Sequence, residues 1–352
     1  MKKHRILVVD DSAFMRKIIS DLISEHPQYE VTATAKNGKE AVEKTKQLKP
    51  DVITMDIEMP EMNGLDALEK IMLYSPTPII MLSSLTKEGA AETILALEKG
   101  AVDFLLKPSG SISLDFYKVK QLLYEKLHIA VNSKIKNQLT TKLNLPVKSI
   151  LEKNASSPRF EHIVALGTST GGPRALNQII SQIPYSFPAP VLIVQHMPPN
   201  FTKSLSQRLD AISNIRVVEA SDGLLLETRT AYIAPGGFHM TVYKERAQCY
   251  RLRISKEEPR AGHRPSVDTL FESLLPFTEL MRHIVLMTGM GSDGANGMKA
   301  LKEAGARTTI VESEETCVVY GMPRAAVQLN CVMHILPQDR IVERLVLEVM
   351  KS

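Results

Sequence analysis

Short apolar runs alternate with amphipathic segments through residues 1–126. Five runs are rich in β-branched residues and predict strands, and after each one apolar residues recur at helical spacing. The predicted strands are residues 5–9, 29–35, 51–55, 78–82 and 102–106, and the predicted helices begin near Phe14, Lys39, Leu65, Glu88 and Leu114. Continuous apolar strands alternating with helices are typical of a parallel sheet covered on both faces. The pattern therefore predicts a (βα)5 domain.

The pattern fades in residues 127–158, where Asn, Ser, Thr and Lys replace the apolar repeats. Such a composition is typical of a solvated connection. We therefore predict a linker here, with helix possible at its start.

A second α/β domain is predicted for residues 159–352. Its strands are residues 162–167, 191–195, 283–287 and 308–312, and its helices run through residues 204–209, through residues 297–304, and from Asp339. Residues 230–244 and 248–255 predict antiparallel strands. We expect a mostly parallel, doubly wound sheet with either mixed strands or an added β-hairpin.

Charge and composition narrow the function classes. Lys and Arg number 17 against 19 acidic residues in residues 1–126, 5 against 1 in residues 127–158, and 21 against 19 afterwards, so the net charge of +4 comes from the predicted linker. This distribution argues against a nucleic-acid surface. No apolar tract is long enough for membrane insertion, and the first apolar run is too short for a signal peptide. Three separated cysteines predict neither disulfides nor a zinc site, so a cytoplasmic protein is expected.

Polar residues follow four of the five predicted strands of the first domain. Asp10 and Asp11 follow the first strand, Asp56 the third, Ser83 the fourth and Lys107 the fifth. Any one of these aspartates could be a simple helix cap. Three carboxylates at one sheet edge instead favour a bound Mg²⁺, with Asp56 as a nucleophile toward phosphate, and with Lys107 and the Ser83 hydroxyl stabilising the added oxygens.

These motifs, VVDDS, DIEMPEMNG, SS and KP, closely resemble the response-regulator receiver family. The resemblance implies a flavodoxin-like fold with strand order 2-1-3-4-5. It also implies phosphorylation of Asp56 by a histidine kinase, metal ligation by Asp10 and Asp11, and a switch pair formed by Ser83 and Phe104. Phe104 considered alone would be interpreted as a core residue.

The second domain has a G-x-S-x-G pentapeptide, Gly167 to Gly171, after a predicted strand and before a helix. This placement is that of a nucleophile turn, with Ser169 exposed at a helix N-terminus. A Gly-rich turn that binds phosphate, or no ligand, explains the pentapeptide equally well. Candidate partners are His196 after the next strand and Asp293 in TGMGSDGANG; His239 and His263 are weaker candidates. The order Ser, His, Asp differs from that of α/β-hydrolases.

Five blocks, GTSTGGPRAL, QHMPPNFTKSLSQRL, YIAPGGFHM, GHRPSVDTLFES and TGMGSDGANGM, closely resemble the chemotaxis protein-glutamate methylesterase (CheB) family. The resemblance implies Ser169 as nucleophile, His196 as base, Asp293 as its orienter, and Met290 with the backbone around Thr170 at the oxyanion site. It implies methyl-accepting chemotaxis receptors as substrates, with methyl esters hydrolysed to methanol and some glutamines deamidated, and no cofactor for the ester chemistry.

Two other functions stay open on residues alone. A receiver often precedes a DNA-binding output domain, although the second half is long and strand-rich for a single helix-turn-helix. GTSTGG could cradle a phosphate, although no G-x-x-x-x-G-K-[ST] is present. We further hypothesise that the unphosphorylated receiver covers the edge that carries Ser169.

Overall fold

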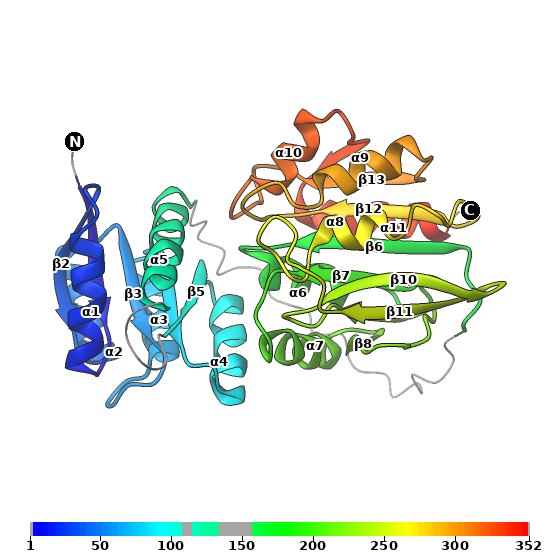
Figure 1. The fold of residues 1–352 in the computed structure, drawn as a ribbon. Helices are drawn as coiled ribbons and strands as arrows, with labels where there is room; N and C mark the ends of the chain where they lie inside the picture. Colours follow the sequence, from blue (N-terminus) through cyan, green and yellow to red (C-terminus); the bar gives the residue numbers. More distant parts are fainter. Residues whose placement is uncertain (1–2, 108–114, 134–156, 351–352) are drawn as a thin grey trace. The chain divides into compact units, whose positions relative to one another are not determined.

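The computed structural model describes residues 3–107, 115–133 and 157–350 (Figure 1). The chain divides into two units, Met1–Leu143 and Asn144–Ser352. The predicted linker, residues 127–158, falls mostly outside the described residues. Its start is helical, because the last helix of the first unit continues to Asn132 with Leu127 and Ala130 fully buried. Boundaries at residues 126 and 158 stay a prediction.

The first unit is a five-stranded parallel sheet with the order β2-β1-β3-β4-β5, which confirms the flavodoxin-like prediction. Its elements are β1 (His4–Val9), α1 (Ala13–Ser24), β2 (Tyr29–Ala35), α2 (Gly38–Leu48), β3 (Val52–Asp56), α3 (Gly64–Tyr74), β4 (Ile79–Ser83), α4 (Lys87–Glu98), β5 (Asp103–Leu106) and α5 (Asp115–Asn132).

Polar caps fix where the helices of this unit begin. The side chains of Ser12, Asn37, Asn63 and Thr86 each accept a hydrogen bond from the amide three residues later. Such a bond satisfies one of the four amides that lack a partner inside the helix. Helices α1 to α4 therefore begin at defined distances from the strand ends, which places the residues at the carboxyl edge of the sheet.

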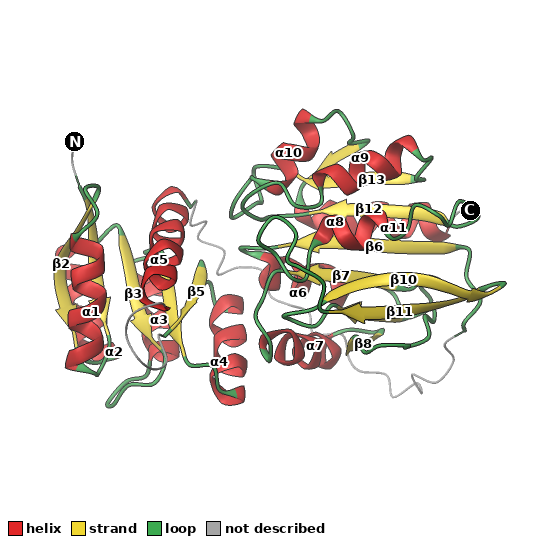
Figure 2. Ribbon diagram, viewed as in Figure 1, coloured by secondary structure: helices red, strands yellow, loops and turns green. Residues whose placement is uncertain are grey.

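The second unit has a seven-stranded parallel sheet with the order β14-β13-β12-β6-β7-β9-β8 (Figure 2). Its elements are β6 (His162–Thr168), α6 (Gly172–Gln182), β7 (Val191–Gln195), α7 (Phe201–Ile212), β8 (Arg216–Glu219), β9 (Thr230–Ile233), β10 (His239–Arg246), β11 (Cys249–Ser255), α8 (Val267–Glu272), β12 (Met281–Leu286), α9 (Ala295–Glu303), β13 (Thr308–Glu312), α10 (Met322–Gln328), β14 (His334–Leu336) and α11 (Gln338–Met350).

One strand direction was predicted wrongly. Residues 230–233 form β9, which pairs in parallel with β7 and β8, whereas antiparallel pairing was expected from residue 230 onward. All four residues of β9 are buried, as in an internal strand of a parallel sheet. The antiparallel pair is β10 with β11, and it forms a separate two-stranded hairpin.

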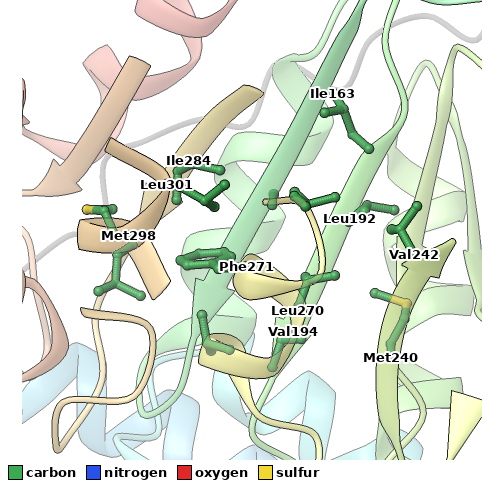
Figure 3. Packing of buried hydrophobic residues seen from close by; sticks show 14 of the residues in the cluster. Ile163, Leu192, Val194, Met240, Val242, Leu270, Phe271, Ile284, Met298 and Leu301 are labelled. Atoms are coloured by element: carbon green, nitrogen blue, oxygen red, sulfur yellow. The ribbon is translucent and has the colours of Figure 1, made fainter. Parts of the chain in front are cut away.

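The hairpin and three helices complete the core of this unit. Buried side chains of β10, β11, α8, α9 and α10 pack on one face of the sheet; Phe271 and Met298 lie against strand residues such as Ile284 (Figure 3). Helices α6, α7 and α11 lie on the other face, with α6 between α7 and α11 (Figure 1). In the described part of the chain, no helix is both long and apolar enough to span a membrane.

Strand β6 is the point where the topology of the second unit changes direction. It pairs with β7 on one side and with β12 on the other. In open parallel sheets, ligands bind beyond the carboxyl ends of the strands at such a point. Ser169 follows β6 and His196 follows β7, while Asp293 lies in the loop after β12. The topology therefore gathers the three candidate residues at one edge.

Candidate active site and phosphorylation site

Three carboxylates meet at the edge of the first sheet. Asp10, Asp11 and Asp56 each place an oxygen within 4.8 Å of the others. Lys107 Nζ lies 2.7 Å from Asp56 Oδ2 and 3.0 Å from Asp10 Oδ2. A cleft of about 500 Å³ opens over Asp56. Of the predicted residues, Asp11, Asp56 and Lys107 line this cleft, and the buried Asp10 contacts Lys107 beside it.

The Asp56 carboxylate is poorly compensated for its charge. Burial, opposed by Lys107, raises the pKa of Asp56 to about 6. The contacts of Lys107 with Asp56 and Asp10 outweigh the effect of its own burial and raise the pKa of the ammonium group. Three carboxylate oxygens close together are the donor set that Mg²⁺ prefers, and one ammonium does not balance their charge. The donor set therefore fits Mg²⁺.

Ser83 and Phe104 lie beside this cleft rather than in it. The Ser83 hydroxyl accepts a hydrogen bond from Thr93 Oγ1 at 2.6 Å and contacts the carbonyl of Gly89 at 3.3 Å. Ser84, one residue later, lines the cleft. Phe104 is buried, at 8% exposure. Their role as a switch pair stays a prediction, and it requires Ser83 to leave Thr93.

Ser169 begins a tight turn between β6 and α6. Its amide donates to Thr288 O at 3.0 Å, and its carbonyl accepts from Gly172 N at 2.8 Å. A Cβ at Gly172 would lie 1.8 Å from Gln195 Oε1, so only glycine fits there. The backbone φ angle of Ser169 is not positive. The hydroxyl is thus presented by a turn whose shape depends on close packing against β7.

His196 and Asp293 are in direct contact. His196 Nε2 lies 2.8 Å from Asp293 Oδ2, and both side chains are largely buried. The other ring nitrogen, Nδ1, is buried and finds no hydrogen-bond partner among the described residues. Ser169 is therefore not yet bonded to it, and Nδ1 is the nitrogen left to receive a proton.

Asp293 is held by the start of helix α8. Its Oδ1 accepts from Ser266 Oγ at 2.9 Å and from Asp268 N at 3.0 Å, and its Oδ2 accepts from Val267 N at 2.7 Å. Burial opposes its ionisation, but the hydrogen bonds from His196 and the two amides prevail and lower the pKa of Asp293 to about 2. The carboxylate is therefore charged at neutral pH.

The loop that carries Met290 lies against Ser169. A Cβ on Gly289 would lie 2.8 Å from Ser169 Cβ, which shows how closely this backbone approaches. Met290 follows and is 41% exposed. The Thr170 carbonyl accepts from Thr288 Oγ1 at 2.9 Å. The backbone around residue 289 and Thr170 therefore borders Ser169, as the oxyanion-site prediction requires.

Two protein families match the chain, one for each unit. Residues 6–115 match the response regulator receiver domain family, and residues 164–345 match the CheB methylesterase family. The chain belongs to the CheB methylesterase family. The protein-glutamate methylesterase/protein-glutamine glutaminase of Geobacillus kaustophilus is 51% identical over 98% of this chain and 99% of its own length. The equivalent Bacillus subtilis protein is 47% identical over 94% of each chain.

A solved structure supports the family assignment for the second unit. The crystal structure of the Thermotoga maritima CheB methylesterase catalytic domain matches with a TM-score of 0.50 and 41% identity, over 53% of this chain and 97% of that one. A DNA-binding output domain, the first alternative considered above, is therefore excluded for this unit.

The two remaining histidine candidates have different surroundings. The His263 ring stacks on His196, with centroids 3.9 Å apart and planes 5° apart. Burial, together with His196, lowers the pKa of His263 to about 4, so His263 is neutral at neutral pH. His239 instead accepts from Ser266 N and contacts the Glu258 carbonyl, so it supports the loop before α8.

Several contributors to the site were missed by sequence reasoning. Ser266, Val267 and Thr288 touch the candidate residues through backbone or hydroxyl atoms, and such contacts leave no periodic signal. The one signal in the sequence for these contacts is that the segments around them are rich in polar residues and glycine.

Proposed function

We propose that this chain hydrolyses methyl esters on glutamate side chains of chemotaxis receptors, releasing methanol, and deamidates receptor glutamines. Its relatives carry the name protein-glutamate methylesterase/protein-glutamine glutaminase across nearly the whole chain. The receiver domain that precedes the methylesterase domain places this activity under the control of phosphorylation. The reaction serves adaptation in bacterial chemotaxis.

The observation that carries the proposal is the state of the His196 ring. One nitrogen is bound to a charged carboxylate, while the other is buried and has no hydrogen-bond partner among the described residues. The backbone amide of His196 is bound to the carbonyl of Thr168, the residue before Ser169. A carboxylate in this position fixes the tautomer and stabilises the imidazolium that forms. His196 is thereby prepared to accept a proton at Nδ1.

In the first half-reaction, the Ser169 oxygen attacks the ester carbonyl carbon while its proton passes to His196 Nδ1. The negative charge moves to the former carbonyl oxygen, where backbone amides near Met290 and Thr170 stabilise it. The bond to the methoxy group then breaks, and methanol leaves with the proton from His196. A glutamyl ester on Ser169 remains.

Water completes the cycle. His196 removes a proton as the water oxygen attacks the acyl carbon, and the bond to Ser169 breaks as that proton returns to the serine oxygen. The product is a glutamate side chain. With a glutamine substrate the leaving group is ammonia, and the remaining steps are the same.

Regulation begins at Asp56. Its carboxylate takes a phosphoryl group from a chemotaxis histidine kinase, and Lys107 contacts the oxygens of the modified residue. Asp10, Asp11 and Asp56 would hold Mg²⁺, which supplies positive charge for phosphate oxygens when bound. The Ser83 hydroxyl would exchange its contact with Thr93 for one with the phosphoryl group, and Phe104 would change position.

A paired substitution tests the two halves. In Ser169→Ala, we expect methanol release from methylated receptor to fall to background, while phosphorylation of Asp56 by acetyl phosphate continues. In Asp56→Asn, basal release should persist, but acetyl phosphate should no longer raise it. Retained hydrolysis in Ser169→Ala would show that another residue is the nucleophile.

A further inference from the structure

Gln195 joins the two strand ends that carry Ser169 and His196. It is the last residue of β7, pairs in register with Thr168 of β6, and is 2% exposed. Each of these two residues immediately precedes one of the candidate reacting groups. A side chain at this position can therefore contact the backbone of both.

The amide of Gln195 uses both of its ends. Nε2 donates to Ser169 O at 3.0 Å and to His196 O at 3.2 Å. Oε1 accepts from Thr168 Oγ1 at 2.5 Å. Two carbonyls require a donor between them, so the orientation of the amide group is determined by its surroundings. The buried amide is thus fully bonded.

The backbone hydrogen bonds of this region involve the amides of Ser169 and His196 and do not join their two carbonyls. The amide of Ser169 is bound to Thr288, on the β12 side, and the amide of His196 is bound to Thr168 O. Among the described residues, Gln195 Nε2 is the donor that binds both the Ser169 and the His196 carbonyl. The packing of Gly172 against Oε1 prevents the amide from shifting toward α6.

We propose that Gln195 is a positioning residue for catalysis, which sets the Ser169 turn and the His196 backbone at a fixed separation by binding both carbonyls. The proposal rests on the proposed function, in which Ser169 is the nucleophile and His196 its base. Gln195 makes no contact with substrate in this role; it determines how often the serine hydroxyl meets Nδ1.

The test is Gln195→Met in the full chain, because methionine has a similar length and no amide. Displacing a reacting group by about 1 Å can cost about 100-fold in rate. We expect kcat for methanol release to fall by a factor of this order while KM changes less than about threefold. The rate at which a fluorophosphonate labels Ser169 should fall in parallel.

Thr309→Val is the matched control. Thr309 is fully buried in the same sheet, and its hydroxyl binds the backbone at Cys331 and Met333, as the Gln195 amide binds backbone carbonyls. Its strand position pairs with Ile284, away from the carboxyl edge. Loss of a buried hydrogen bond should lower stability in both variants, whereas only Gln195→Met should lower kcat and labelling.

Thr168→Val provides a second measurement if Gln195→Met does not fold. It removes the hydroxyl that holds Oε1 and keeps both donors of the amide, so a smaller loss of labelling, about three- to tenfold, is expected. Wild-type kcat and labelling in a folded Gln195 or Thr168 variant would overturn the inference. Activity in Ser169→Ala would instead overturn the proposed function, so the two failures are distinguishable.

Discussion

Asp56 and Asp293 are equally buried, at 4% exposure, and both lie near the carboxyl ends of strands in parallel sheets, yet their pKa values are shifted in opposite directions. Burial raises the pKa of Asp56 to about 6, whereas hydrogen bonds overcome burial and lower that of Asp293 to about 2. Asp56 pairs with Lys107 and accepts a hydrogen bond from the amide of Ile57, and the Asp10 carboxylate lies nearby. The difference lies in the donors supplied by each site.

The contrast matches the two kinds of chemistry. In the proposed mechanism Asp293 stays charged through a complete proton-transfer cycle, and helix α8 provides the hydrogen-bond donors within the protein. Asp56 faces a cleft next to two further carboxylates, where in the proposed function Mg²⁺ would supply the missing positive charge. A carboxylate left under-compensated is therefore a sign of a site completed by a ligand.

Neutralising Asp293 gives the largest predicted effect. Asparagine keeps the shape but cannot stabilise the imidazolium, so Asp293→Asn should lower kcat for methanol release about 10³- to 10⁴-fold. Asp268→Asn is the control, because Asp268 is also buried in this region and binds Gly297 N instead of His196. Its activity should stay within about tenfold of wild type. Equal losses in the two variants would remove the special role of Asp293.

Stability should change in opposite directions at the two aspartates. A raised pKa means that Asp56 costs stability as pH rises from about 4 to about 6, so Asp56→Asn should stabilise the receiver by about 2 kcal/mol at pH 7.5 without Mg²⁺. A lowered pKa means that Asp293 contributes stability above about pH 4, which is lost as pH falls toward about 2. Asp293→Asn should therefore destabilise the second unit by about 2 kcal/mol at pH 7.5.

Amide hydrogen exchange, measured in the presence of a chelator, can follow the unfolding of each unit separately. The exposed residue Glu30 offers a control, since Glu30→Gln should change stability by less than about 0.5 kcal/mol. A destabilised receiver in Asp56→Asn would contradict the proposed difference.

The smallest predicted effect concerns His263. A stacked ring pair contributes about 1 kcal/mol, so if the stack orients His196, His263→Ala should lower kcat about fivefold. His263→Phe keeps a ring in the stack and should stay near wild type. Equal kcat values for the alanine variant and the wild type would show that stacking does not orient the base.

Much of this fold follows from local pattern. Apolar runs such as that of β6, all buried, predicted the strands, and the receiver order 2-1-3-4-5 is confirmed. The predicted direction of β9 was wrong because a run of four buried residues gives the same sequence pattern in parallel and antiparallel strands. Pairing partners depend on chain segments far away, which periodicity does not report.

The sequence could name the candidate residues that the structure brings to one sheet edge, but not the contacts that hold them there. Ser169, His196 and Asp293 could be named because each follows a predicted strand. The donors from α8 to Asp293 and the stacked His263 could not, because residues 25 or more positions apart meet only after folding. The Ser83 contact with Thr93 likewise depends on how α4 packs on β4.

The most direct test of the account is a ¹³C NMR titration of the side-chain carboxyl groups in the full chain without Mg²⁺. The account predicts that Asp56 titrates near pH 6 and that Asp293 stays ionised down to about pH 2. An Asp293 that titrates near or above Asp56 would contradict it, because His196 would then lack the charged partner on which the proposed chemistry depends.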